Sequence, residues 1–339
     1  MADGKSPKSA AKRAPADEQD RGHLRLGLGS TIAQRGSASL LTVRVPLAAN
    51  LLVAVAKSAA TAITRSPSLT AEAAHSWADT GNEVFLLVAN RRAARPPDGA
   101  HPLGHGREAY VWSLFAALGL FVAGGAVSIT HGVNELRAPS PADHFAVGYA
   151  VLGISAVLEG TSFLRSVHQA TPEAESLQRD LIEHVMATSD PTLRAVFAED
   201  ASALLGLLLT AVGLAAHQLT GSVIPDAIGS ILIGVLLVVV AVLLIDRNRQ
   251  FLVGEEADPR VRRAVIQALL NLPQVQRVTY LRLEVVGPRT VSVIGDVDLA
   301  GDDVDSNVAV RRRALEVLIE ASPAVAGTVL SLSCRTNRR

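Results

Sequence analysis

The stretch that decides the fold runs from Glu72 to Glu83 and reads EAAHSWADTGNE. It lies inside a run from about Leu69 to Asn90 that is otherwise apolar enough to cross a membrane. An ionisable side chain at the centre of a membrane helix costs roughly 2.5–3.5 kcal/mol by insertion scales. On a helix, His75 and Asp79 lie one turn apart on one face, where an imidazole and a carboxylate can hold one divalent cation. The alternative is a polar contact between helices, but the stretch contains more polar groups than such a contact needs.

Six apolar segments give the chain the composition of a membrane protein. Hydrophobic residues make up 49% of the 339 residues, and the mean hydropathy is +0.29. The formal net charge of zero gives no general attraction for nucleic acids. The single cysteine, Cys334, excludes an intrachain disulfide and a thiolate metal cluster. The segments cover about 45–63, 69–90, 111–133, 145–163, 192–214 and 224–245, each near the ~20 residues that span a bilayer as a helix.

The two ends of the chain differ from this apolar middle. Residues 1–40 lack the apolar core of a signal peptide and are rich in small and basic residues, which favours a disordered, basic, cytoplasmic tail. Residues 41–250 hold the six spans, and residues 255–335 have the composition of a soluble domain. In that domain we expect a helix over 261–270, strands over 280–286 and 291–299, a helix over 308–320 and a strand over 328–333. This order is typical of a small α+β sandwich.

The loops between the spans alternate in their content of arginine. Arginines 91, 92, 95 and 107 lie between the second and third spans, arginines 165, 179 and 194 between the fourth and fifth, and arginines 247 and 249 after the sixth. Cytoplasmic loops carry such an excess, so both termini are expected in the cytoplasm. Arg107 is then expected to pair with Glu255 or Glu256, which follow the sixth span at the same membrane surface. One of these loops, 171–189, is charged and periodic, which predicts a surface helix with Leu177, Leu181, Ile182 and Val185 on one side. Lysine is rare beside arginine, which favours a GC-rich bacterial genome and hence the bacterial inner membrane.

A second acidic pair, Glu199 and Asp200, lies near the start of the fifth span. With the histidine and aspartate of the second span, these residues predict a divalent-cation site inside the membrane, where the ion compensates the buried carboxylates. The ion must leave the site again, so a moderate affinity is expected. Glu159 lies in the fourth span, where a hydrogen-bonded contact between helices and a role in the ion path are equally open.

The loop after the second span reads DGAHPLGHGR over residues 98–107. Asp98, His101 and His105 are spaced by three and four residues, and the proline and glycines let such a loop fold back on an ion. We therefore expect a second, cytoplasmic metal site here. The alternative is a plain polar turn that leads into the third span.

The soluble domain offers a weaker third possibility. It has no histidine, since the last one is His217, but aspartates gather near one strand end at positions 296, 298, 302, 303 and 305. A solvated acidic loop is the favoured interpretation, and a weak oxygen-ligand site for a hard cation is the alternative.

With these motifs, the chain resembles the cation diffusion facilitator family over roughly residues 40–335. The resemblance rests on the six spans, His75 and Asp79 in the second span, the HPLGHGR loop over 101–107, the acidic pair of the fifth span and the small cytoplasmic domain. It implies export of Zn²⁺ or a related divalent ion in exchange for protons, by a homodimer paired through ferredoxin-like cytoplasmic domains. The Ala-Glu-Asp form of the fifth span, over 198–200, is similar to the zinc transporter 9-like branch.

The chain departs from the family pattern in the fifth span, where the usual motif is His-xxx-Asp. Val196 stands four residues before Asp200, so the histidine is missing. Glu199 is the candidate replacement, although it points about 100° away from Asp200 on a helix. More carboxylates and fewer imidazoles favour harder ions, which leaves Mn²⁺, Fe²⁺ and Co²⁺ open. The resemblance nevertheless implies Zn²⁺ first, because Zn²⁺ is the commonest substrate of the family. The missing histidines of the soluble domain argue against a regulatory metal site there.

The prediction is therefore a proton-coupled exporter of divalent cations that binds no separate cofactor and is not an enzyme. No His-Glu-xx-His helix occurs, which disfavours an intramembrane metalloprotease. A non-transporting membrane scaffold or modulator that keeps the fold is the alternative, because the motif of the fifth span is incomplete. The neutral imidazole of His75 is the natural proton exchanger, since histidine changes charge near neutral pH.

Overall fold

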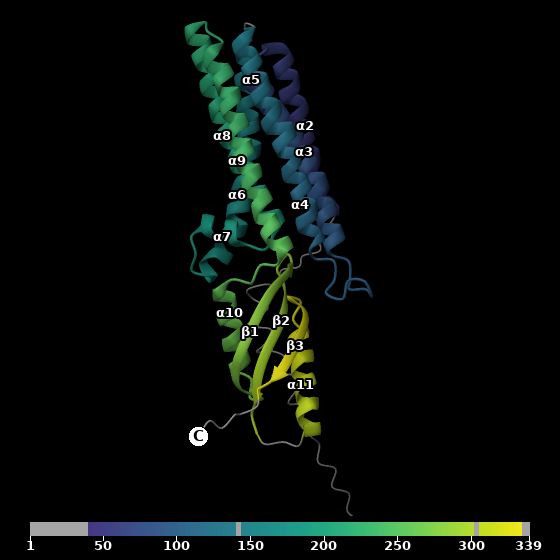
Figure 1. Cartoon of the computed structure of the whole chain (residues 1–339). Coiled ribbons are helices and arrows are strands. Elements are labelled where there is room, and N and C mark those ends of the chain that lie inside the picture. Colours follow the sequence, from purple (N-terminus) through teal and green to yellow (C-terminus); the bar gives the residue numbers. More distant parts are fainter. Residues whose placement is uncertain (1–39, 140–143, 302–304, 334–339) are drawn as a thin grey trace, which may run out of the picture.

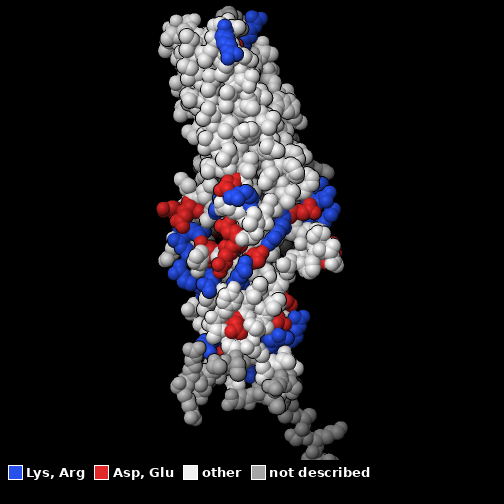
Figure 2. Space-filling view, viewed as in Figure 1, with Lys and Arg blue, Asp and Glu red and all other residues white. Residues whose placement is uncertain are grey.

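The computed structural model describes residues 40–139, 144–301 and 305–333, and shows a long helical bundle stacked on a small sheet domain (Figure 1). The expected N-terminal tail lies outside these residues, apart from Leu40. Below a few basic residues at its far end, the visible surface of the bundle carries almost no charge, whereas Lys, Arg, Asp and Glu gather in a belt at the junction with the sheet domain (Figure 2). This distribution is that of a membrane domain above a polar interface.

The bundle contains helices that follow the six apolar segments in order. Glu108–Arg137 is one continuous helix with a π-helical segment in its middle, and the bounds of all the elements are α2 (Leu40–Thr64), α3 (Pro67–Ala93), α4 (Glu108–Gly119), η1 (Leu120–Ala126), α5 (Val127–Arg137), α6 (Phe145–Ser176), α8 (Pro191–Thr220) and α9 (Ile224–Val253). Within the described chain, the helices Glu108–Arg137, α6, α8 and α9 are long and apolar enough to cross a membrane. In α2 the described residues Asn50–Thr64 form a shorter apolar helix, and α3 carries the ionisable stretch.

Helix α3 occupies the middle of the bundle and contacts α2, α4, α5, α8 and α9. It begins at Pro67 and is capped by Ser66, whose side chain accepts a hydrogen bond from the backbone N–H of Leu69 at 3.3 Å. Its buried face is unusually polar, because Glu72, His75 and Asn82 are all almost inaccessible to solvent. The packing of α3 therefore brings ionisable groups into the bundle interior.

Glycines let α9 approach the helix Glu108–Arg137 closely. A Cβ atom at Gly234 would lie 2.6 Å from Ile129 Cγ1 and 2.8 Å from the carbonyl oxygen of Gly125. Small residues of this kind allow membrane helices to pack backbone against backbone. They fix α9 against the third span, on the side of α3 away from α2 (Figure 1).

The surface helix expected over 171–189 is wrong in its bounds. Helix α6 continues to Ser176 with Pro172 inside it, and a separate short helix, α7 (Leu181–Ala187), follows. Val185 is buried, but Ile182 is 69% exposed, so the four apolar residues do not share one buried side. The hydropathy of a segment indicates which residues cross the membrane, but a helix can continue beyond them. The end of α6 at Ser176 therefore could not be predicted from hydropathy.

The sheet domain has the expected order of helix, strand, strand, helix and strand. Its elements are α10 (Pro259–Leu270), β1 (Val275–Gly287), β2 (Thr290–Leu299), α11 (Asp305–Glu320) and β3 (Val325–Leu332). The sheet order is β1-β2-β3, with β1 antiparallel and β3 parallel to β2. Alternate strand residues such as Leu283, Val293 and Leu330 pack with α10 and α11 in one core, so both helices cover the same face. The α+β prediction is thus confirmed, with a sheet of three strands.

Candidate metal sites

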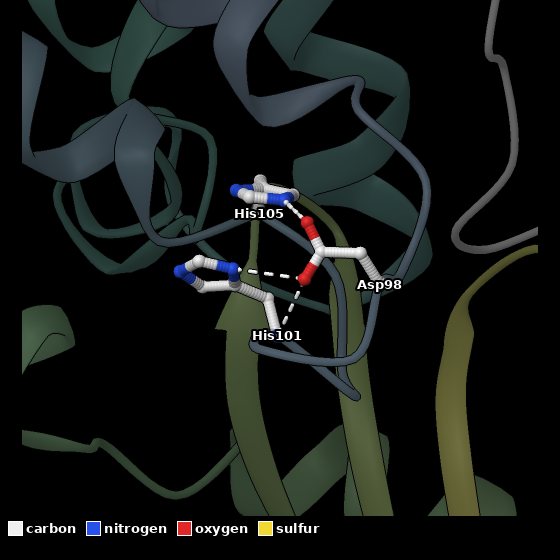
Figure 3. Close-up of side chains that lie close together, drawn as sticks. All are labelled: Asp98, His101 and His105. Carbon is white, nitrogen blue, oxygen red and sulfur yellow. Dashed lines mark hydrogen bonds and ion pairs between the residues drawn. The ribbon is translucent and has the colours of Figure 1, made fainter.

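The loop between α3 and α4 brings Asp98, His101 and His105 together, as the sequence predicts (Figure 3). The carboxylate of Asp98 lies between the two imidazoles, with Oδ1 3.1 Å from Nδ1 of His101 and Oδ2 3.0 Å from Nε2 of His105. One ligand atom from each residue lies within 4.8 Å of the others. Among the residues that the structure describes, this is the one group of three or more His, Cys, Asp and Glu side chains that meets that distance.

Backbone hydrogen bonds fold this loop into its shape. The N–H groups of Ala100 and His101 donate to Asp98 Oδ1 at 2.9 and 2.7 Å, in an Asx-type turn. Gly104 has a φ of +81°, a conformation that suits glycine, and its N–H donates to the carbonyl oxygen of His101 at 2.9 Å. The hydrogen bond from His105, followed by the amide of His101, holds the pKa of the Asp98 carboxyl below its usual value. The anionic form that a cation requires is therefore the stable form of Asp98.

The loop also touches the sheet domain. A pocket of about 520 Å³ lies between the loop and Val286 of β1, with His101, Leu103 and His105 in its wall. Gly106 approaches the turn after β1 so closely that a Cβ atom on it would lie 2.6 Å from the carbonyl oxygen of Val286. The candidate loop site is thus built at the contact between the membrane domain and the soluble domain.

Charged contacts around this junction join the same two parts. Arg107 Nη2 lies 2.5 Å from Glu284 Oε1 of β1, so the expectation that Arg107 pairs with Glu255 or Glu256 is wrong. Glu256 instead makes a bridge-type backbone pairing with Glu284, which brings β1 to the end of the bundle. On the other side of the turn, the guanidinium of Arg289 lies 2.7 Å from Glu173 Oε1.

The intramembrane residues lie near one another but form two separate groups. The first has its contacts on α3 and contains His75, Asp79 and Glu199, and the second contains Asp200, whose partner lies on α6. His75 Nε2 is 3.3 Å from Asp79 Oδ1 within α3. The amide of Asn82, also on α3, donates to Glu199 of α8, whereas Asp200 accepts from Ser162 of α6 at 2.8 Å.

The expected divergence of the acidic pair is therefore seen. Glu199 faces α3 and Asp200 faces α6, so they do not share one face of α8. No three of His75, Asp79, Glu199 and Asp200 have ligand atoms within 4.8 Å of one another. Both nitrogens of His75 and Oε1 of Glu199 are buried without a hydrogen-bond partner, so unsatisfied ligand atoms remain available on α3 and α8.

A buried ion network beside these residues was not predicted from the sequence. Lys57 of α2 is fully buried, and its Nζ lies 3.0 Å from Glu72 Oε2 of α3 and 3.6 Å from Glu159 Oε1 of α6. A lysine in an otherwise apolar span was the available signal, because such a charge requires a partner. Glu159 thus makes a contact between helices, as an ion pair, and its role in the ion path stays a prediction.

A second buried polar cluster lies at the end of the bundle far from the sheet domain. Asp226, at the start of α9, accepts hydrogen bonds from Ser66 at 2.6 Å and from Ser68. Its Oδ2 is 3.9 Å from Nδ1 of His217, near the end of α8. The cluster ties the ends of α3, α8 and α9 together, and its carboxylate is satisfied by hydroxyl groups.

The acidic cluster of the soluble domain shows no metal-like arrangement where it is described. Asp296 accepts hydrogen bonds from Thr279 and Ser331, and these bonds lower the pKa of its carboxyl. Asp298 lies 3.5 Å from Arg277. Positions 302 and 303 fall outside the described residues, as does the side chain at 305. The part that is described is an ordinary hydrogen-bonded strand edge.

These features define a class: a multi-pass membrane protein with ionisable groups inside its helical bundle, a histidine-rich loop at the membrane surface and a small α+β domain below. The family model of the cation efflux transmembrane domain matches residues 43–253. The chain therefore belongs to the cation efflux family, the cation diffusion facilitators expected from the motifs.

The relatives place the chain in one branch of that family. It is 35% identical to metal tolerance protein C4 of Arabidopsis thaliana over 70% of this chain and 52% of that protein. It is 30% identical to the human protein named proton-coupled zinc antiporter SLC30A9, mitochondrial, over 81% of this chain and 49% of that protein. The chain spans about half the length of these relatives. The expected zinc transporter 9-like branch is confirmed at this level.

Proposed function

We propose that this protein exports a divalent cation, with Zn²⁺ as the first candidate, in exchange for protons. The observation that carries the proposal is the set of ionisable groups inside the bundle: His75 and Asp79 on α3, and Glu199 and Asp200 on the neighbouring α8. Such groups are costly in a membrane and mark ion paths and proton relays. The name of the human relative, a proton-coupled zinc antiporter, supports the choice of ion and of counter-ion.

Within this proposal His75, Asp79 and Asp200 hold the ion, and Glu199 is the fourth ligand in place of the missing histidine. In the structure the side-chain amide of Asn82 donates a hydrogen bond to one oxygen of Glu199, and the hydroxyl of Ser162 donates one to Asp200. Ion binding then requires these hydrogen bonds to be exchanged for the ion as α3, α6 and α8 move closer. This exchange couples ion binding to helix movement, which is what alternating access needs.

The loop triad has a separate proposed role on the cytoplasmic side. Asp98 and the two imidazoles provide three ligands, which leaves a coordination position open to water. Asp98 and His101 are more than half exposed, so exchange with the solvent is fast. We propose that this site captures ions or couples ion binding to the soluble domain, and that it does not form part of the passage through the membrane.

The topology and assembly follow from the same interpretation. We propose six spans, with α2 and α3 as the first two, both termini in the cytoplasm and the bacterial inner membrane as the location. The face of the sheet away from α10 and α11 leaves Tyr280, Ile294 and Val329 exposed, by 50%, 39% and 64%. A homodimer formed through the soluble domains would cover this apolar face.

A flux panel in liposomes tests the transport proposal and its alternatives. Purified protein is offered Zn²⁺, Mn²⁺, Fe²⁺, Co²⁺ and Cd²⁺ in turn, with Asp79→Ala protein as the control. Zn²⁺ flux that Asp79→Ala abolishes supports zinc transport, and a preference for Mn²⁺, Fe²⁺ or Co²⁺ supports a harder-ion transporter. If parent protein of native oligomeric state moves none of the five ions, the proposal fails in favour of a non-transporting scaffold.

A further inference from the structure

The buried lysine of the first span lies beside the proposed ion path. Lys57 is completely inaccessible to solvent, and its ammonium group is held by Glu72 at 3.0 Å and Glu159 at 3.6 Å. Burying a charge in a bundle is expensive even with partners, and apolar residues in its place are often as stable. Stability therefore does not explain why the chain keeps a lysine at this position.

The two carboxylates that hold Lys57 lie one turn from a proposed ion ligand or from the hydrogen-bond partner of one. Glu72 precedes His75 by three residues on α3, about 4.5 Å along the helix axis. Glu159 precedes Ser162 by three residues on α6, and Ser162 donates to Asp200. The lysine thus connects the two groups into which the intramembrane residues are divided.

The carboxylate of Glu72 is also fixed against α8. Its Oε1 occupies the space where a side chain at Gly206 would stand, and that oxygen has no hydrogen-bond partner. Glu72 of α3 is therefore held between Lys57 of α2 and Gly206 of α8, the helix that carries Glu199 and Asp200. A change in the charge around Glu72 therefore acts on the proposed ion ligands over a short distance, through helices that are packed together.

The electrostatic consequence has a definite sign. The region around the site is rich in carboxylates, since Glu72, Asp79, Glu159, Glu199 and Asp200 act on one another electrostatically. Each of these negative charges strengthens the binding of a divalent cation. A fixed positive charge within about 10 Å of a divalent ion weakens binding by about tenfold or more at an effective dielectric constant of about 20. Lys57 supplies that charge and also holds Glu72 and Glu159 in ion pairs, so that these carboxylates do not bind the ion.

We propose that Lys57 is a positioning residue that acts through Glu72 and Glu159 as a built-in competing cation, lowering the affinity of the intramembrane site so that the ion is released. This inference rests on the proposed transport function. It predicts that removing the positive charge tightens ion binding, whereas a merely structural lysine would give weaker binding or a protein that does not fold.

The test measures Zn²⁺ binding by calorimetry in a His101→Ala/His105→Ala background, which removes the loop site. In the full-length protein, Lys57→Gln should lower the Kd by about tenfold, and Lys57→Arg, which keeps the charge, should leave it near the parent value. In liposomes Lys57→Gln should lower both KM and the maximal rate, because the bound ion leaves more slowly. Folded Lys57→Gln protein that binds Zn²⁺ as weakly as the parent, or more weakly, overturns the inference.

A second variant covers the case in which Lys57→Gln does not fold. Glu159→Gln removes one partner and leaves the lysine charge less compensated, so the Kd should rise, opposite in direction to Lys57→Gln. A Kd for Glu159→Gln that is unchanged or lower overturns the inference. If neither the background protein nor Lys57→Arg binds or transports Zn²⁺, it is the transport proposal that fails.

Discussion

Gly106 lies at the closest approach between the membrane domain and the soluble domain, and Gly106→Ala should undock the two. The backbone of Gly106 is not in the left-handed region, so alanine meets no conformational strain there. Its Cβ, however, would lie 2.6 Å from the carbonyl oxygen of Val286 and 2.8 Å from Cα of Gly287. Ordinary contacts begin at 3.4 Å, so the two backbones would have to separate by about 0.8 Å in a junction that is closely packed.

The cost of that separation sets the size of the effect. Overpacking of this kind costs about 1–3 kcal/mol. It corresponds to a change of about 5- to 150-fold in the equilibrium between docked and undocked states. The turn after β1 reports this equilibrium, because the backbone N–H of Arg289 donates to Ser189 Oγ of the membrane domain at 3.0 Å.

Hydrogen exchange at the Arg289 amide measures the prediction. Exchange of a peptide that covers residues 287–291 should accelerate about 5- to 150-fold in Gly106→Ala protein. Gly99→Ala is the matched control in the same loop, because no atom lies within 4 Å of a Cβ at that position, and it should exchange like the parent. Equal exchange in Gly106→Ala and the parent would refute the docking described for this junction.

Three further predictions concern charge. Arg107→Glu should lower the thermal unfolding temperature, because it removes the ion pair with Glu284 at the junction. Adding Glu284→Arg in the same chain should restore part of that loss, and an absence of rescue would show that the ion pair does not stabilise the junction. The pKa of Asp98 is lowered first by its hydrogen bond from His105, so the stabilisation from its ionised form is present above pH about 3.9 and is lost only as the pH falls through the lower folded value. Asp98→Asn should weaken ion binding by the loop, because it removes the anionic one of the three ligands, and binding at neutral pH equal to the parent's in calorimetry would count against this. Glu199→Ala and Asp200→Ala should each weaken intramembrane Zn²⁺ binding to a similar degree in calorimetry, and an effect of Asp200→Ala alone would remove Glu199 from the site.

Sequence reasoning predicted the order of the elements because hydrophobic length and the alternation of strand residues are local properties. It also predicted the loop triad, since the spacing of Asp98, His101 and His105 suits one turn-rich loop. The divergence of Glu199 and Asp200 followed from helix geometry alone. Each of these features depends on residues that are close in the chain.

The features that were missed depend on contacts between distant segments. The network of Lys57 with Glu72 and Glu159 joins three helices, and the sequence shows only that each charge needs a partner. The partner of Arg107 was predicted wrongly because β1 reaches the end of the bundle and presents Glu284 there, a register that only the folded chain reveals.

Proton counterflow in sealed liposomes tests the proposed exchange most directly. Purified protein is reconstituted with a pH indicator and a Zn²⁺ indicator inside the vesicles, and Zn²⁺ is added outside. We predict that Zn²⁺ entry raises the internal pH, because protons leave as the ion enters, and that Asp79→Ala abolishes both signals together. Zn²⁺ entry with no change in internal pH, once membrane potential is clamped, would contradict exchange with protons, and parent-like signals from Asp79→Ala would contradict the intramembrane site.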